Sequence, residues 1–116
     1  MQEKILVIDD EPLILSSIER ALVKVGYGVV TATDMKGFKN ALTSQRFDLI
    51  IMDLHMKDTD TNELVREARR FMPSVKFLTI SGSVPVQNSK HFLQKPFKID
   101  VLREKVREIL DEPSRD

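Results

Sequence analysis

The chain has 116 residues, of which 41% are hydrophobic and 31% are charged, and its formal net charge at pH 7 is zero. This length suits one ordinary domain, so we predict a single unit over residues 1–116. The balanced charge gives no electrostatic reason to expect nucleic acid, and the lack of cysteine excludes disulfides and thiolate metal sites. Because the first residues lack the features of a signal peptide and no apolar run has membrane-spanning length, we expect a cytoplasmic protein that binds no membrane.

Apolar runs alternate with helical patterns along the chain. Three runs are continuously apolar, as in parallel strands buried on both faces, and two weaker runs have the same character. In chain order the expected strands are residues 5–8, 29–32 (weaker), 49–52, 77–80 and 91–94 (weaker). Apolar residues at helical spacing predict four helices, within residues 14–25, 35–42, 64–71 and 99–109. The alternation predicts an α/β fold, with an open parallel sheet covered by helices on both faces and right-handed crossovers.

Residues that start and stop helices agree with this order of elements. Pro12 suits the first turn of the first helix and Gly26 suits its end. Asp34 suits the N-cap of the second helix, while Asp60 and Glu63 have the spacing of a capping box at the third. These signals predict the helix boundaries independently of the apolar periodicity.

Polar side chains stand where the expected strands end. In open parallel sheets, ligands bind at the carboxyl ends of the strands. Those ends carry Asp9, Asp10 and Glu11 after the first strand, Asp53 after the third, Ser81 after the fourth, and Lys95 with Pro96 after the fifth. Two carboxylates 4 Å apart repel by roughly 4 kcal/mol at an effective dielectric constant near 20, so such a group needs a cation. The candidate ligands are hard oxygens, which favours Mg²⁺, and Lys95 would supply the remaining positive charge.

The acidic run at residues 9–11 also has a simpler explanation. Acidic residues cap helix N-termini and interact favourably with the helix dipole, so this run could serve the first helix alone. Asp53 has no such explanation, because it follows a buried strand and no helix start is expected until about Asp60. Ser81 and Lys95 taken singly suit an ordinary turn and loop, so a functional interpretation depends on the whole set.

Four segments together resemble the receiver domain of two-component response regulators, over nearly the whole chain from Lys4 to about Leu110. The segments are VIDDEP, DLIIMDLHM, FLTISG and FLQKPF, which follow one another in the family's order. The resemblance implies a flavodoxin-like, doubly wound sheet of five parallel strands in the order 2-1-3-4-5. It also implies a phosphoacceptor domain whose partner is a sensor histidine kinase or a histidine phosphotransfer domain.

The resemblance assigns a role to each residue of the acidic group. Asp53 would be the phosphoacceptor. Asp9 and Asp10 would hold Mg²⁺ together with Asp53 and the backbone carbonyl of His55. Lys95 would contact the incoming phosphoryl group. The expected chemistry is phosphorylation of the domain itself followed by slow hydrolysis, without an external substrate.

The resemblance also implies a switch and a cis peptide bond. Ser81 would contact the phosphoryl group and move towards it, and Phe92 would turn into the space that the hydroxyl leaves. Phe92 has no hydroxyl, so it would act by packing alone. The Lys95–Pro96 bond is expected to be cis, as it usually is in this family.

The chain departs from the family in two places. Lys57 and Thr61 stand where the family has a Pro and a Gly after the phosphoacceptor. Residues 82–90 replace the family's fourth helix, and their Pro, Gly, Ser, Asn and Val content has poor helix propensity. We therefore predict that this helix is missing or reduced to one turn. Its loss would remove much of the family's usual dimer face, which favours a monomer.

Two other functions remain open on the sequence alone. The first is a Mg²⁺-dependent phosphatase with an Asp nucleophile, of the haloacid-dehalogenase type. That family needs its second Asp two residues after the first, where this chain has Glu11. The second is a pseudo-receiver that serves as an interaction scaffold without being phosphorylated, although the presence of the acidic residues and Lys95 argues against it.

Overall fold

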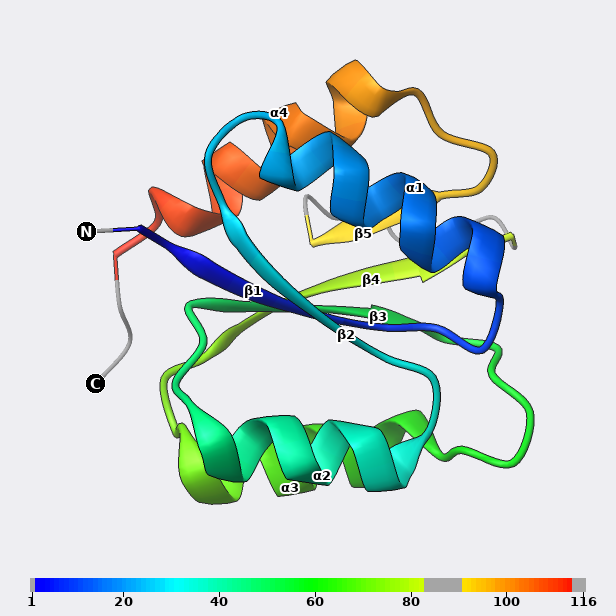
Figure 1. The fold of residues 1–116 in the computed structure, drawn as a ribbon, viewed down its shortest axis with the longest axis vertical. Coiled ribbons are helices and arrows are strands. Elements are labelled where there is room, and N and C mark those ends of the chain that lie inside the picture. Colours follow the sequence, from blue (N-terminus) through cyan, green and yellow to red (C-terminus); the bar gives the residue numbers. More distant parts are fainter. Residues whose placement is uncertain (1, 83–90, 114–116) are drawn as a thin grey trace.

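A computed structural model of the chain describes residues 2–82 and 91–113. Its elements are β1 (Lys4–Ile8), α1 (Pro12–Val23), β2 (Gly28–Ala32), α2 (Met35–Ser44), β3 (Leu49–Asp53), α3 (Thr61–Phe71), β4 (Lys76–Ser81), β5 (Phe92–Gln94) and α4 (Ile99–Leu110). The strands form one parallel sheet in the order β2-β1-β3-β4-β5, which confirms the predicted fold class (Figure 1). The four predicted helices are also confirmed. The predicted loss of the family's fourth helix concerns a segment of which residues 83–90 lie outside the described residues.

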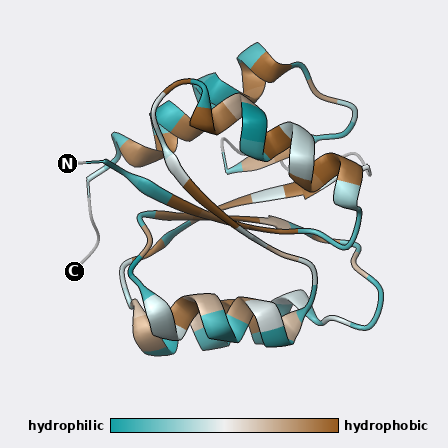
Figure 2. Cartoon of the chain, viewed as in Figure 1, coloured by the Kyte–Doolittle hydropathy of each residue, from teal (hydrophilic) through white to brown (hydrophobic). Residues whose placement is uncertain are grey.

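Helices cover both faces of the sheet. In Figure 1, α1 and α4 lie on one face, whereas α2 and α3 lie on the other. Ile5 and Val7 of β1 belong to the core that includes α1 and α4, and Leu6 and Ile8 belong to the core that includes α2 and α3. Because successive strand residues point to opposite faces, a strand covered on both sides has to be apolar at every position. The strands accordingly form a largely hydrophobic layer in Figure 2.

The starts of the helices largely follow the sequence signals. Asp34 is the N-cap of α2 as predicted, and its Oδ1 accepts a hydrogen bond of 2.8 Å from the N–H of Gly37. Asp60 is the N-cap of α3, but its carboxylate accepts from the N–H of Asn62 at 2.9 Å. A capping box would use the N–H of Glu63 instead, so the predicted position of the cap is right and its predicted geometry is wrong.

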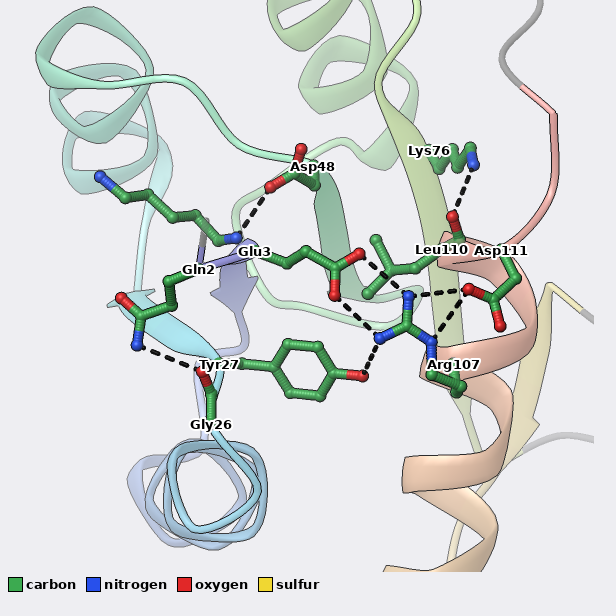
Figure 3. A network of polar contacts seen from close by, with 10 residues as sticks. Gln2, Glu3, Gly26, Tyr27, Asp48, Lys76, Arg107, Leu110 and Asp111 are labelled. Carbon is green, nitrogen blue, oxygen red and sulfur yellow. Dashed lines mark hydrogen bonds and ion pairs between the residues drawn. The ribbon is translucent and has the colours of Figure 1, made fainter.

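A network of polar contacts fixes the end of α4 at the amino edge of the sheet (Figure 3). Arg107 donates to both carboxylate oxygens of Glu3, at 2.8 and 3.0 Å, and also contacts Asp111 and the hydroxyl of Tyr27. The hydrogen bonds from Arg107 lower the pKa of Glu3. Lys76 of β4 donates to backbone carbonyl groups at the end of α4. The amino edge is thus occupied by contacts that join α4 to β4 and to the residues directly before β1 and β2.

None of the helices formed by the described residues is long and apolar enough to cross a membrane.

We expect the variant Asp34→Ala to lose about 1 kcal/mol of unfolding free energy, because the N–H of Gly37 would lose its capping acceptor. The measurement is urea unfolding followed by circular dichroism. Lys39→Ala, an exposed substitution on the same helix, serves as the control and should change the unfolding free energy by less than about 0.5 kcal/mol. Equal stability of the two variants would contradict the assigned cap.

Candidate functional site

The carboxyl edge of the sheet brings the predicted polar residues together. Asp9 directly follows β1, Asp53 is the last residue of β3, Ser81 is the last residue of β4, and Lys95 directly follows β5. These strands are parallel neighbours, so their carboxyl ends lie side by side on the edge opposite the Arg107 network. The structure therefore gathers on one edge the side chains that are up to 86 residues apart in the chain.

Four carboxylates form a tight group on this edge. One oxygen from each of Asp9, Asp10, Glu11 and Asp53 lies within 4.8 Å of the others. Asp9 and Asp53 are almost fully buried, with exposed fractions of 1% and 4%. Two such charges 4.8 Å apart repel by about 3.5 kcal/mol at an effective dielectric constant near 20. The group therefore requires positive charge to be stable in its ionised form.

Lys95 supplies one positive charge. Its Nζ lies 3.3 Å from Asp53 Oδ2, 3.4 Å from Asp9 Oδ2 and 3.4 Å from Glu11 Oε1. Burial works to lower the pKa of Lys95, but the nearby carboxylates of Asp9 and Asp53 raise it overall, so the ammonium stays charged at neutral pH. The contact with Glu11 was not predicted, although this residue stands in the same acidic run of the sequence.

The backbone holds Lys95 in place. Its N–H donates to the carbonyl of Ser81 at 2.8 Å, which continues the pairing of β5 with β4 beyond the last strand residue. The following Lys95–Pro96 peptide bond is cis, the isomer that the family resemblance implies. Both features belong to the point where the chain leaves β5 and turns towards α4.

Two of the carboxylates are anchored by their own turns. Asp9 Oδ1 accepts a hydrogen bond of 2.9 Å from the N–H of Glu11, and Asp53 Oδ1 accepts one of 3.1 Å from the N–H of His55. In both residues the other oxygen, Oδ2, contacts Lys95. Each buried carboxylate thus has one oxygen held by the backbone and the other turned towards the ammonium.

The third carboxylate is anchored from a different loop. Asp10 Oδ2 accepts a hydrogen bond of 2.9 Å from the N–H of Lys57, which lies between β3 and α3. Glu11 occupies the N-cap position of α1, but its side chain makes no capping hydrogen bond. The acidic run is therefore not explained by capping, because its carboxylates point to each other, to Lys95 and to neighbouring backbone N–H groups.

Burial raises the pKa of Asp9, and the neighbouring charge of Asp53 adds to the increase. The N–H of Glu11 and the ammonium of Lys95 act in the opposite direction without outweighing it. One ammonium is thus too little to compensate the buried carboxylates, and a second cation would relieve them. The oxygen donors of this group are those that Mg²⁺ prefers, so these residues fit that ion.

The two residues predicted to form a switch lie on neighbouring strands. Ser81 is buried at the end of β4 and pairs in register with Gln94. Phe92 is partly buried at the start of β5 and pairs with Thr79. The two predicted switch residues are therefore one strand apart and offset by two positions along the sheet, which leaves Phe92 further from the carboxyl edge.

Comparison with known proteins gives the family. The family model of the response regulator receiver domain matches residues 5–107. The transcriptional regulatory protein GlrR of Escherichia coli K12 is 32% identical over 93% of this chain, and the sensor kinase CckA of Brucella abortus is 28% identical over 92% of it. The chain covers only 26% of GlrR and 12% of CckA.

A crystal structure has the same fold over almost its full length. The CheY-like response regulator receiver domain protein of Methanospirillum hungatei superposes with a TM-score of 0.83, at 27% identity, over 96% of this chain and 95% of that one. The family model, the strand order and the polar residues at the strand ends all agree. This chain therefore belongs to the receiver domain family of two-component response regulators.

Proposed function

We propose that the 116 residues form one receiver domain that accepts a phosphoryl group on Asp53 and changes its binding to partners in response. The donor is the phosphohistidine of a sensor histidine kinase or of a histidine phosphotransfer domain. The observation that carries this proposal is the contact of Lys95 Nζ with both Asp53 and Asp9, inside a buried carboxylate group at the carboxyl edge of the sheet. The domain acts on itself, so it is a signalling domain and not an enzyme with an external substrate.

The reaction is a transfer between two side chains. A carboxylate oxygen of Asp53 forms a bond to the phosphorus atom, while the bond between phosphorus and the donor's imidazole nitrogen breaks. The imidazole nitrogen keeps the electron pair and takes a proton from water. Lys95 and Ser81 contact the phosphoryl oxygens and balance their charge, which is the main contribution a protein makes to phosphoryl transfer. Hydrolysis of the acyl phosphate by water later restores the carboxylate.

Asp9, Asp10, Asp53 and the backbone carbonyl of His55 would hold Mg²⁺. When bound, this ion neutralises charge on the carboxylates and on the phosphoryl oxygens. The residues of the chain then have two tasks: they keep the ligand oxygens in place through backbone hydrogen bonds, and they keep Lys95 beside Asp53.

The response to phosphorylation would start at Ser81. Phosphorylation adds roughly one negative charge and new acceptor oxygens at Asp53. The hydroxyl of Ser81 moves to meet these oxygens, and Phe92 turns into the space that the hydroxyl leaves. The proposal includes a cytoplasmic monomer whose partner is the kinase or phosphotransfer domain, without direct contact to nucleic acid or membrane.

Incubation with acetyl phosphate and Mg²⁺ should add the mass of one phosphoryl group to the wild-type protein. Asp53→Asn should gain none, because the amide is not a nucleophile towards phosphorus. Intact-mass spectrometry measures both. Asp58→Asn is the matched control, because Asp58 is an exposed carboxylate on the same loop and Asn tolerates its positive φ of 57°.

An unmodified wild type, or an equal gain of mass on Asp53→Asn, would disprove the phosphoacceptor role. Asp9→Asn and Asp53→Asn together test the phosphatase alternative. Turnover of a generic phosphate ester that is lost in Asp9→Asn but kept in Asp53→Asn would favour that alternative.

Asp9→Asn should be more stable than the wild type at neutral pH when no divalent cation is present. The folded state raises the pKa of Asp9 above its ordinary value of 3.8, so it binds the proton more tightly than the unfolded state does. The wild type therefore loses stability as the pH rises from that value through the raised pKa of the folded state. The advantage of Asp9→Asn should shrink as the pH falls to 3.8 or below. Thermal unfolding across this pH range measures it.

Mg²⁺ should stabilise the wild type more than Asp9→Asn at neutral pH. Free Mg²⁺ at ten times its dissociation constant stabilises the wild type by about 1.4 kcal/mol, whereas Asp9→Asn has lost a ligand and gains less. Asp100→Asn, an exposed substitution in α4, is the control and should respond to Mg²⁺ as the wild type does.

In the pH experiment, an equal pH dependence of unfolding in the wild type and in Asp9→Asn would show that Asp9 is not the group that titrates.

A further inference from the structure

We infer that the backbone N–H of Lys57 positions Asp10 as a metal ligand, so that the loop between β3 and α3 sets how tightly the site binds a divalent cation. This inference rests on the proposed function, because it takes the carboxylate group to be a Mg²⁺ site. The contact is made by the backbone of Lys57, while its side chain is exposed.

The anchor of Asp10 differs in kind from those of the other two Asp residues. Asp9 and Asp53 are held by N–H groups two positions further along the chain, whereas the N–H that holds Asp10 comes from a residue 47 positions away. The bond from Lys57 to Asp10 Oδ2 is 2.9 Å long, a normal length for an N–H···O hydrogen bond. It joins the loop after β1 to the loop after β3, and these loops supply all the proposed ligands except Asp53, the last residue of β3.

The second carboxylate oxygen of Asp10, Oδ1, is the one that would bind the cation. Among the described residues, no hydrogen bond to Asp10 Oδ1 is present, so this oxygen stays available for a cation while Oδ2 is held. Asp10 is partly exposed and would otherwise sample several rotamers. Holding it beforehand lowers the conformational entropy that is lost on binding. Partners that hydrogen-bond a ligating carboxylate typically change metal affinity 10- to 100-fold.

The bond depends on an N–H that a proline would lack. The side chain of Lys57 is exposed, and among the described residues it makes no hydrogen bond or ion pair. The next residue, Asp58, has a φ of 57°, a left-handed conformation that Asp adopts more readily than most residues. The loop therefore turns directly after the N–H that reaches Asp10.

Two substitutions at one position separate the N–H from the side chain. Lys57→Pro removes the N–H, and we expect it to weaken Mg²⁺ binding about tenfold, as measured by isothermal titration calorimetry. Lys57→Ala keeps the N–H and should bind within about twofold of the wild type. In an Asp10→Ala background, Lys57→Pro should cause no further loss, because its effect acts through Asp10. Wild-type affinity in Lys57→Pro, or an equal loss in Lys57→Ala, would overturn the inference.

A measurement without metal tests the contact between Lys57 and Asp10 separately from the proposed function. Hydrogen exchange followed by NMR should show a protected Lys57 amide in the metal-free wild type. Asp10→Ala should lose that protection while the β1 and β3 amides keep theirs. Unchanged exchange at Lys57 would overturn the inference even if Lys57→Pro failed to fold. If the wild type bound no Mg²⁺ while the amide stayed protected, the metal site would be wrong and only the contact between the loops would stand.

Discussion

The contact of the Lys95 ammonium with Asp9 and Asp53 is the interaction on which this site depends. Taking carboxylates out of water is unfavourable unless a partner of opposite charge compensates them. Asp9 and Asp53 are nearly fully buried, and burial raises the pKa of Asp9 in spite of the nearby ammonium of Lys95. A site with this remaining imbalance is suited to take up a cation and an oxyanion together, which is the combination that phosphoryl transfer requires.

The fold explains why the charges are found on one edge. A sheet that is covered on both faces has little room for a charged side chain in the middle of its strands, so the charged groups stand in the first or last strand positions or just beyond them. The amino and carboxyl edges of the sheet therefore carry different groups of charged residues. The amino edge is closed by the Arg107 network, which joins α4 to Glu3 and Tyr27 (Figure 3). The carboxyl edge carries the carboxylates and Lys95, and its loops are joined by the bond between Asp10 and Lys57.

The loop between β3 and α3 both follows Asp53 and holds two of the carboxylates. It follows Asp53 directly, and it supplies N–H groups from His55 and Lys57 to two of the carboxylates. A change in the backbone of this loop would therefore shift the carboxylates of Asp53 and Asp10 without replacing either residue.

The sequence by itself determined the order of elements and that Asp9, Asp53, Ser81 and Lys95 lie at the carboxyl ends of the strands. Strands that are apolar at every position and helices of period 3.6 are local patterns, and in a parallel sheet they bring Asp53, Ser81 and Lys95 to one edge without further information. The fate of the family's fourth helix stays a prediction from composition. Only the tertiary structure decided that Glu11 contacts Lys95 instead of capping α1, and that the N–H of Lys57 reaches Asp10. These contacts depend on how two loops bend towards each other, and residue types alone do not encode the direction of a single N–H group.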